Sequence, residues 1–224
     1  MADHRRSRFP DIRCIFFDLD GTLADTTELI LVTFRETLSE LGLPLRSDEE
    51  LLSQIGRPLH LQARDIDAQR AGEIFDLYRR LYDRNHDALA REFPDVRESL
   101  AELKARGYHL AVVTSKRSSS AHGDIAYYHL AEYFEAVVTA DDTERHKPHA
   151  DPALKALELL EAMPAEATFI GDSPYDLRCA HAAHVLAGAV EWGPFPRERL
   201  EAEKPDYWAP SPLGLLGLFP GPGR

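Results

Sequence analysis

Residues 14–26 read Cys-Ile-Phe-Phe-Asp-Leu-Asp-Gly-Thr-Leu-Ala-Asp-Thr, and this stretch decides the fold. Its first four residues are an apolar run that ends at a glycine-containing turn, a pattern typical of a strand buried on both faces. Asp18 and Asp20 follow directly, at the end of a strand where open α/β sheets carry their chemistry. Because they are two residues apart, an extended backbone would point both carboxylates to one side. A plain Asp-Gly turn is the alternative, but such a turn would not usually carry two carboxylates after a buried strand.

The rest of the chain alternates strand and helix patterns. Strands are predicted near residues 108–113, 136–139, 167–170 and 185–190, with helices near 96–106, 118–130, 152–160 and 174–184 between them. A short helix near 196–203, an edge strand at 207–208 and a last helix near 211–218 are predicted to end the fold. This alternation predicts an α/β fold, with a Rossmann-like parallel sheet and helices on both faces.

One segment does not fit that alternation. Residues 27–92 show helical periodicity and no strand signal, whereas a crossover between parallel strands needs only about 12 residues or more. We therefore predict a small all-helical cap domain at 25–92, inserted into a discontinuous core of residues 1–24 and 93–224. Both junctions lie beside the end of the first strand, so the insert is expected to hang over that site.

Composition limits the classes of partner. The chain has 224 residues, a formal net charge of −12 and 44% hydrophobic residues, which argues for a globular protein without a nucleic-acid or anionic-membrane partner. No apolar run approaches the roughly 20 residues of a membrane span. Cys14 and Cys179 are expected to be buried thiols in a reducing compartment, so we predict a cytoplasmic protein. We expect it to be either a monomer or a homodimer.

Polar residues follow three of the predicted strands. Besides Asp18 and Asp20, the strand ending at residue 113 is followed by Thr114 and Ser115, and the strand ending at residue 170 by a Gly-Asp-Ser-Pro-Tyr-Asp segment with Asp172 and Asp176. Four carboxylates gathered in one pocket repel one another unless a divalent cation is present. Oxygen ligands of this kind suit Mg²⁺.

These motifs, in this order, resemble those of the haloacid dehalogenase superfamily of phosphatases. The resemblance spans about residues 12–215: Asp18 and Asp20 match motif one, Thr114 motif two, Lys147 motif three, and Asp172 with Asp176 motif four. Taken alone, Thr114 could be a helix N-cap and Lys147 a residue of a surface turn. Their order and spacing within the set favour the catalytic interpretation.

The resemblance implies a mechanism and a magnesium site. Asp18 would attack phosphorus and form an aspartyl-phosphate, and Asp20 would act as the general acid and base. The Thr114 hydroxyl and the Ser115 N–H would hold a phosphoryl oxygen, while Lys147 would neutralise the nucleophile and the transferring group. Mg²⁺ would be held by Asp18, the backbone carbonyl of Asp20 and Asp172, with Asp176 acting through water or by orienting Lys147.

The position of the cap resembles that of phosphoglycolate phosphatases and related pyrophosphatases. The resemblance therefore implies a phosphatase, of the phosphoric monoester hydrolase type, that acts on small phosphorylated molecules, either esters or anhydrides. A sugar phosphomutase of the β-phosphoglucomutase type is the alternative within the same family, and a non-catalytic regulatory protein is the alternative from another class. Arg57 in the cap could hold an anionic end of the substrate, or it could be a structural surface arginine.

Overall fold

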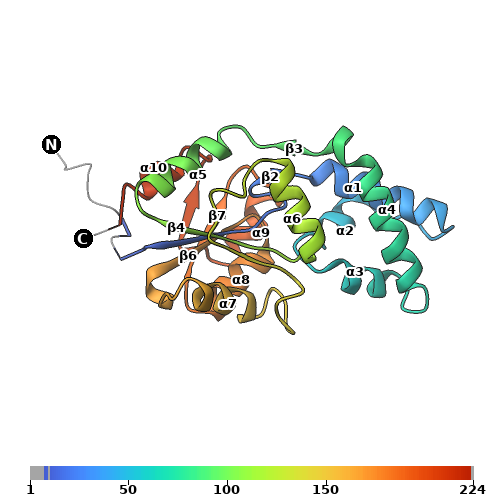
Figure 1. Cartoon of the computed structure of the whole chain (residues 1–224). Helices are drawn as coiled ribbons and strands as arrows, with labels where there is room; N and C mark the ends of the chain where they lie inside the picture. Colours follow the sequence, from blue (N-terminus) through green and yellow to red (C-terminus); the bar gives the residue numbers. More distant parts are fainter. Residues whose placement is uncertain (1–7, 10, 223–224) are drawn as a thin grey trace.

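The computed structural model of the chain describes residues 8–9 and 11–222 (Figure 1). The first seven residues of the predicted core, with residues 10, 223 and 224, lie outside the described residues. Six parallel strands form one sheet in the order β5-β4-β1-β6-β7-β8. Their bounds are β1 (Cys14–Phe17), β4 (His109–Val113), β5 (Ala136–Val138), β6 (Ala167–Gly171), β7 (Leu186–Val190) and β8 (Tyr207–Ala209).

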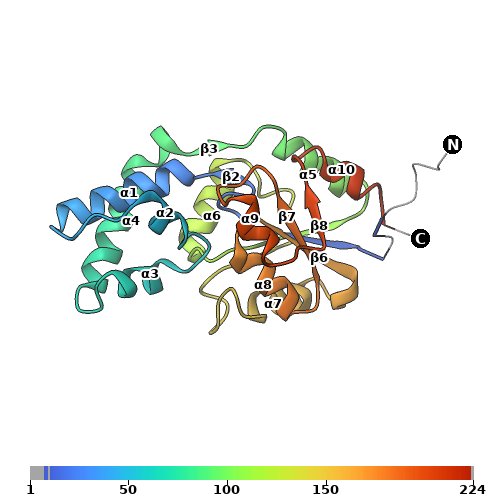
Figure 2. The ribbon, with the colours of Figure 1, turned by 180° about the vertical axis from the view of Figure 1, so that it is seen from behind.

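Helices cover both faces of this sheet. In both views α5 and α10 lie on one face and α7 and α8 on the other (Figures 1 and 2). The predicted α/β fold is confirmed, including β8 at the sheet edge. The helices of the core are α5 (Val96–Ala105), α6 (Ser118–Tyr127), α7 (Asp151–Leu159), α8 (Pro174–Ala182), α9 (Arg197–Glu201) and α10 (Leu215–Leu218).

Two C-terminal helices are shorter than their predicted ranges. The helix predicted near 196–203 covers only α9, and the one predicted near 211–218 covers only α10. Before α10, the Ser211 hydroxyl accepts a hydrogen bond from the Gly214 N–H at 3.0 Å, which closes a turn in place of a first helical turn. Serine favours such local side-chain-to-backbone turns over helix interiors.

β1 is the central strand around which the site is built. All four of its residues are buried, since strands flank it on both sides and helices cover both faces, which explains its continuous apolar run. Phe17 is in register with Val112 of β4 and with Ile170 of β6. The three strands therefore end within one residue of one another, and the residues that follow them share one edge of the sheet.

The segment from residue 27 to residue 89 forms four helices at that same edge, away from the described ends of the chain (Figures 1 and 2). α1 packs against α4, where the rings of Phe34 and Tyr78 lie 4.4 Å apart between centroids. We call α1–α4 the helical insert; its helices are α1 (Thr27–Glu40), α2 (Asp48–Leu52), α3 (Leu59–Ile66) and α4 (Ala71–Leu89).

The chain enters and leaves the helical insert through two very short strands. β2 (Ala24–Asp25) pairs antiparallel with β3 (Arg91–Glu92). The expectation of no strand between residues 27 and 92 is therefore wrong at its last two residues. A two-residue strand leaves too little sequence pattern to detect, because its pairing with β2, rather than its own composition, defines it.

Two expectations from composition can be compared with the structure. Cys14 and Cys179 are free and buried, as predicted. Among the described residues, the helices are all too short or too polar to cross a membrane.

Candidate active site

The residues that follow three of the strands meet at one point of the sheet edge. Asp18 follows β1, Thr114 follows β4 and Asp172 lies just after β6, and all three side chains are buried. The backbone fixes this meeting point, because the Asp18 N–H donates to the Ile170 carbonyl at 3.0 Å and the Thr114 N–H donates to the Val138 carbonyl at 2.9 Å. The predicted convergence of polar strand ends is thus present in the structure.

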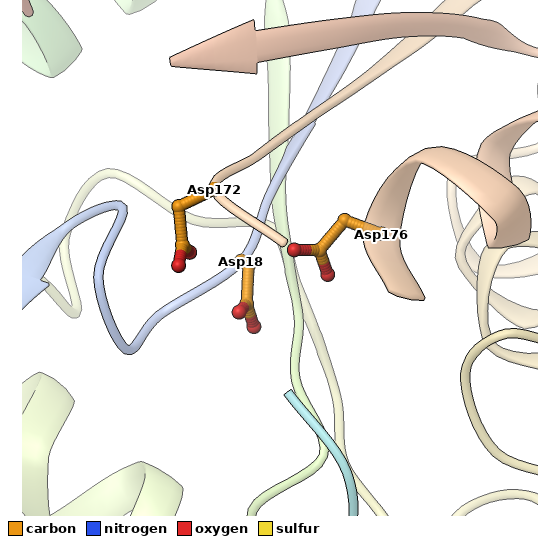
Figure 3. A group of neighbouring side chains, drawn as sticks. All are labelled: Asp18, Asp172 and Asp176. Atoms are coloured by element: carbon orange, nitrogen blue, oxygen red, sulfur yellow. The ribbon is translucent and has the colours of Figure 1, made fainter. Parts of the chain in front are cut away.

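Three carboxylates form a compact cluster at this point. Asp18, Asp172 and Asp176 each offer an oxygen within 4.8 Å of the others, and Figure 3 shows the three groups gathered from the ends of β1 and β6 and the start of α8. Asp176 is brought there by the N-terminus of α8, where Ser173 and Asp176 cap the helix reciprocally.

Lys147 lies within this acidic cluster. Its Nζ atom is 2.8 Å from Oδ1 of Asp18 and 2.6 Å from Oδ1 of Asp176, and it donates to the Val113 carbonyl at 3.4 Å. Only 1% of the lysine side chain is exposed, so the alternative of a surface turn is wrong. We call Asp18, Lys147, Asp172 and Asp176 the Lys147 cluster.

Asp172 is oriented by its surroundings but retains an unused oxygen. Its Oδ1 accepts from the Thr22 hydroxyl at 2.8 Å, whereas its buried Oδ2 has no hydrogen-bond partner. The backbone of Gly21, at φ +81°, approaches this carboxylate so closely that a Cβ atom there would lie 2.5 Å from Oδ2. Glycine is required both by the positive φ and by this contact.

The electrostatics of the Lys147 cluster favour a cation. Burial raises the pKa of Asp18 to about 7 against the opposing charge of Lys147, and burial together with the charges of Asp176 and Asp18 raises the pKa of Asp172 well above its usual range. When ionised, three carboxylates face one ammonium, which leaves an excess of two negative charges. The unpartnered Oδ2 of Asp172 and this excess fit a divalent cation, and hard carboxylate oxygens fit Mg²⁺.

Thr114 and Ser115 lie beside the Lys147 cluster. The Thr114 hydroxyl accepts from the Lys116 N–H at 3.2 Å, and the N-cap of the next helix is Arg117, so the helix-cap alternative for Thr114 is wrong. The Ser115 hydroxyl donates to the Gly56 carbonyl at 2.6 Å, which connects the core to the helical insert at the edge of the site.

The carboxylate of Asp20 lies apart from the other three acids. Its Oδ1 accepts from the Thr26 hydroxyl at 2.6 Å and is 2.8 Å from Nζ of Lys116. The expectation that the four carboxylates share one cluster is therefore wrong. Three of them lie in the Lys147 cluster, whereas the Asp20 carboxylate contacts a different lysine, Lys116. The cause is that β1 ends at Phe17 and the backbone bends at Leu19, so the extended backbone on which the two side chains would have remained parallel does not reach Asp20.

A pocket opens between the core and the helical insert. Asp18, Asp20 and Thr114 lie on its core side, and it contains about 860 Å³ of space not filled by atoms, part of it open to solvent. Arg57 lines the insert side, where its guanidinium contacts Asp65 at 2.7 Å and also bonds Gln54. Arg57 is thus both a pocket residue and a structural residue of the insert.

Sequence reasoning missed three residues next to Asp20. Lys116 contacts Asp20, and Tyr82 and Asp124 contact Lys116. Lys116 follows the same strand as Thr114, so its position was the only available signal. Tyr82 and Asp124 lie in ordinary helical stretches, and nothing in the sequence pattern sets them apart.

Comparison with known proteins gives consistent results. Residues 15–190 match the family described as haloacid dehalogenase-like hydrolase. Pyrophosphatase PpaX of Bacillus mycoides is 39% identical over 208 residues, covering 93% of this chain and 97% of that protein. A haloacid dehalogenase-like family hydrolase from Streptococcus pneumoniae superposes with a TM-score of 0.82 at 30% identity, covering 93% of this chain and 99% of the other. A protein from Lactobacillus plantarum, described provisionally as a phosphoglycolate phosphatase, superposes with a TM-score of 0.83 at 27% identity, with the same coverage.

Proposed function

The chain belongs to the haloacid dehalogenase-like hydrolase family, and from that premise we propose that it is a Mg²⁺-dependent phosphatase of small phosphate compounds. Relatives named as pyrophosphatases support the phosphatase and pyrophosphatase class. The observation that carries the proposal is the buried contact of Lys147 with Asp18, beside an unpartnered carboxylate oxygen of Asp172 and beneath a pocket.

Asp18 is the proposed nucleophile. One of its oxygens forms a bond to phosphorus while the bond from phosphorus to the leaving oxygen breaks, which gives an aspartyl-phosphate. Asp20 supplies the proton that the leaving oxygen takes up. In the second half, Asp20 accepts a proton from water as the water oxygen bonds to phosphorus, and the aspartyl-phosphate bond breaks to release inorganic phosphate and regenerate Asp18.

The neighbouring groups prepare Asp18 for this chemistry. Lys147 is held by Asp18, Asp176 and a backbone carbonyl, so its positive charge stays fixed beside the reacting phosphoryl group. Burial alone would lower the pKa of Lys147, but the charges of Asp176 and Asp18 outweigh burial and keep its pKa above the ordinary value. Thr114 and the Ser115 N–H are proposed to hold phosphoryl oxygens.

Mg²⁺ would be held by Asp18, the backbone carbonyl of Asp20 and Asp172. When bound, it would neutralise the excess negative charge of the carboxylates and of the phosphoryl oxygens. Asp176 is proposed to act by orienting Lys147, because its other oxygen already accepts from the Ser173 N–H and hydroxyl at 3.0 and 2.6 Å.

The pocket favours a phosphate monoester with an organic group. The wall that the helical insert contributes is largely apolar, and a substrate with a carbon skeleton would cover it, whereas inorganic pyrophosphate would not. The apolar residues of this wall are Ile30, Phe34, Ile55, Leu59, Phe75 and Tyr78. Pyrophosphate is the second candidate, and the names of the PpaX relatives support it.

The helical insert is proposed to act as the cap over the site. The segment between α2 and α3 contacts the core twice, since the Gly56 carbonyl accepts from the Ser115 hydroxyl and the Ser53 carbonyl accepts from the Tyr175 hydroxyl at 3.0 Å. A cap in this position excludes water and large substrates. We therefore propose small phosphorylated molecules as substrates, without nucleic-acid or membrane partners, and the cytoplasm as the location.

The test is release of inorganic phosphate by the purified chain with Mg²⁺. Phenyl phosphate, phosphoglycolate and pyrophosphate are the substrates, and Asp18→Asn is the matched control because it keeps the shape of the side chain. We expect release from the unchanged chain, fastest with the ester that best covers the apolar wall, and background release from the variant. Release of no phosphate above the Asp18→Asn background, from any of the three substrates, would overturn the proposal.

A further inference from the structure

A second lysine connects the helical insert to Asp20. Lys116 follows β4, and its Nζ atom lies 2.8 Å from Oδ1 of Asp20 and 2.7 Å from the Tyr82 hydroxyl, and it also bonds Oδ2 of Asp124. Asp20 and Lys116 belong to the core loops, Asp124 to α6 of the core and Tyr82 to α4 of the helical insert. We call these four residues the Lys116 cluster.

The members of the Lys116 cluster are shielded from water. The exposed fractions of the Lys116, Asp20 and Asp124 side chains are 13%, 13% and 6%. Charges in such surroundings need partners, and an ammonium has three donors, here matched by three acceptors. Burial would lower the pKa of Lys116, but the charges of Asp20 and Asp124, with the hydrogen bond to Asp124, outweigh burial and hold its pKa well above the ordinary value, so the ammonium keeps its charge.

The Thr26 and Lys116 contacts to the Asp20 carboxylate are both to the same oxygen atom. The Thr26 hydroxyl and the Lys116 ammonium both approach Oδ1, at 2.6 and 2.8 Å. Two donors on one oxygen fix the plane and direction of the carboxyl group, and they leave Oδ2 to exchange a proton with the substrate. The direction of Oδ2 therefore depends on where the ammonium of Lys116 is held.

Asp124 and Tyr82 decide that position. Asp124 contacts the same ammonium as Asp20 and also contacts His86 of α4, whose Nε2 is 3.2 Å from Oδ1 of Asp124. Tyr82 supplies the contact from the helical insert, and its hydroxyl also donates to Asp124 at 3.3 Å. Figure 1 shows α6 at the end of the core that faces the insert, so both contacts to Lys116 form where core and insert meet.

We propose that Asp124 and Tyr82 are positioning residues for the acid–base carboxylate. They hold Lys116 against Oδ1 of Asp20, so that Oδ2 faces the leaving oxygen only when α4 of the helical insert lies on the core. In the step concerned, the bond from phosphorus to the leaving oxygen breaks and the proton on Oδ2 moves to that oxygen. This inference rests on the proposed role of Asp20.

The test compares two substrates of similar shape that differ in their leaving group. Phenyl phosphate has a poor leaving group that needs a proton, whereas 4-nitrophenyl phosphate has a good one that needs little help. General acid catalysis contributes roughly 10²–10⁴-fold, so a misdirected Asp20 should lower kcat/KM for phenyl phosphate by about tenfold and for 4-nitrophenyl phosphate by about twofold or less. The variants are Asp124→Asn, which removes the anion, and Tyr82→Phe, which removes only the hydroxyl.

Two further variants serve as a positive and a negative control. Asp20→Asn should show the same selectivity in stronger form. Asp206→Asn is the matched control, because its carboxylate accepts from the Ala187 N–H at 2.8 Å at the far edge of the sheet, and it should leave both substrates unchanged. If Asp124→Asn does not fold, Tyr82→Phe carries the test, since it keeps the ring and its packing.

The outcomes separate this inference from the proposed function. Equal losses on both substrates, or no loss, in Tyr82→Phe and Asp124→Asn would mean that these residues only join insert and core, and would overturn the inference while leaving the phosphatase intact. An unchanged chain that is inactive on every substrate would overturn the proposed function and this inference with it.

Discussion

Asp18 and Asp20 are two residues apart, and each contacts a different lysine: Lys147 contacts Asp18, and Lys116 contacts Asp20. The surroundings of the two lysines differ. The Lys147 cluster is built wholly from the core, at the ends of β1 and β6 and the start of α8, and its side chains are at most 3% exposed. The Lys116 cluster joins the core to the helical insert, and the Asp20 and Lys116 side chains each keep 13% exposure. The contacts of the first cluster therefore lie within the core, whereas the second cluster includes a contact from the insert, that of Tyr82.

The difference suggests a division of labour within the proposed reaction. The groups proposed to bind metal and to attack phosphorus are fixed by the sheet, so they are in place before the substrate arrives. The group proposed to transfer protons, Asp20, would be fixed through the insert, so proton transfer would be set only once the pocket is covered. This arrangement would limit the reaction of the nucleophile with unsuitable substrates.

The largest expected effect tests the Lys147 cluster at its nucleophile. Asp18→Asn removes the attacking carboxylate, so turnover of phenyl phosphate should fall by several orders of magnitude, far more than for Asp124→Asn. Steady-state phosphate release measures this, with mass spectrometry to exclude deamidation. Ordinary turnover by intact Asp18→Asn would remove the covalent role and with it the contrast between the clusters.

Stability distinguishes the two lysines. Lys147→Met leaves Asp18 and Asp176 buried without their counter-charge, and breaking a buried ion pair costs ~3–5 kcal/mol of unfolding free energy. Lys116→Met should cost less, because its surroundings are more exposed. Urea denaturation of both variants without Mg²⁺ gives the two values, and a larger loss for Lys116→Met would reverse the comparison.

Metal binding should depend on the Lys147 cluster. At free Mg²⁺ about 100 times the dissociation constant, binding to the folded state adds ~2.7 kcal/mol and raises the Tm. Asp172→Asn should abolish this increase, since it removes the unpartnered anionic oxygen. Asp124→Asn is the matched substitution in the other cluster and should retain it. An equal Mg²⁺-dependent rise of the Tm in all three proteins would mean that the cation binds elsewhere.

The smallest expected effect concerns Arg57 on the insert side of the pocket. Its guanidinium is already engaged by Asp65 and Gln54, so only part of its charge is available to a substrate. Arg57→Ala should raise KM for phosphoglycolate a few-fold and leave phenyl phosphate nearly unchanged, in line with the ~1 kcal/mol of an exposed ion pair. Equal changes for the two substrates would assign Arg57 to structure alone.

The sequence predicted the Lys147 cluster far better than the Lys116 cluster, for a physical reason. Asp18, Thr114 and Asp172 follow buried apolar strands. Parallel strands in register bring their ends together, and this does not depend on how the surface helices pack. Family resemblance is confirmed over residues 15–190. The roles of these residues, and the boundaries of the cap, stay predictions.

The contacts of Lys116 could not be predicted in the same way. Tyr82 and Asp124 are 42 residues apart, and their meeting depends on how α4 packs against α6. Helical periodicity says which face of each helix is apolar but not which polar residues two helices bring together. The carboxylate of Asp20 was expected beside that of Asp18, but the backbone bends at Leu19, between the two residues.

The pairing of β2 with β3 gives the molecule a modular architecture. Residues 25 and 91 lie in register, so the chain leaves and re-enters the core at one place, and a segment of another length could be spliced between these points without re-threading the sheet. Exchange of the segment between β2 and β3 would place a new substrate pocket over an unchanged Lys147 cluster. Such an exchange would remove Tyr82, so each transplanted segment would have to supply its own partner for Lys116 before proton transfer regained full efficiency.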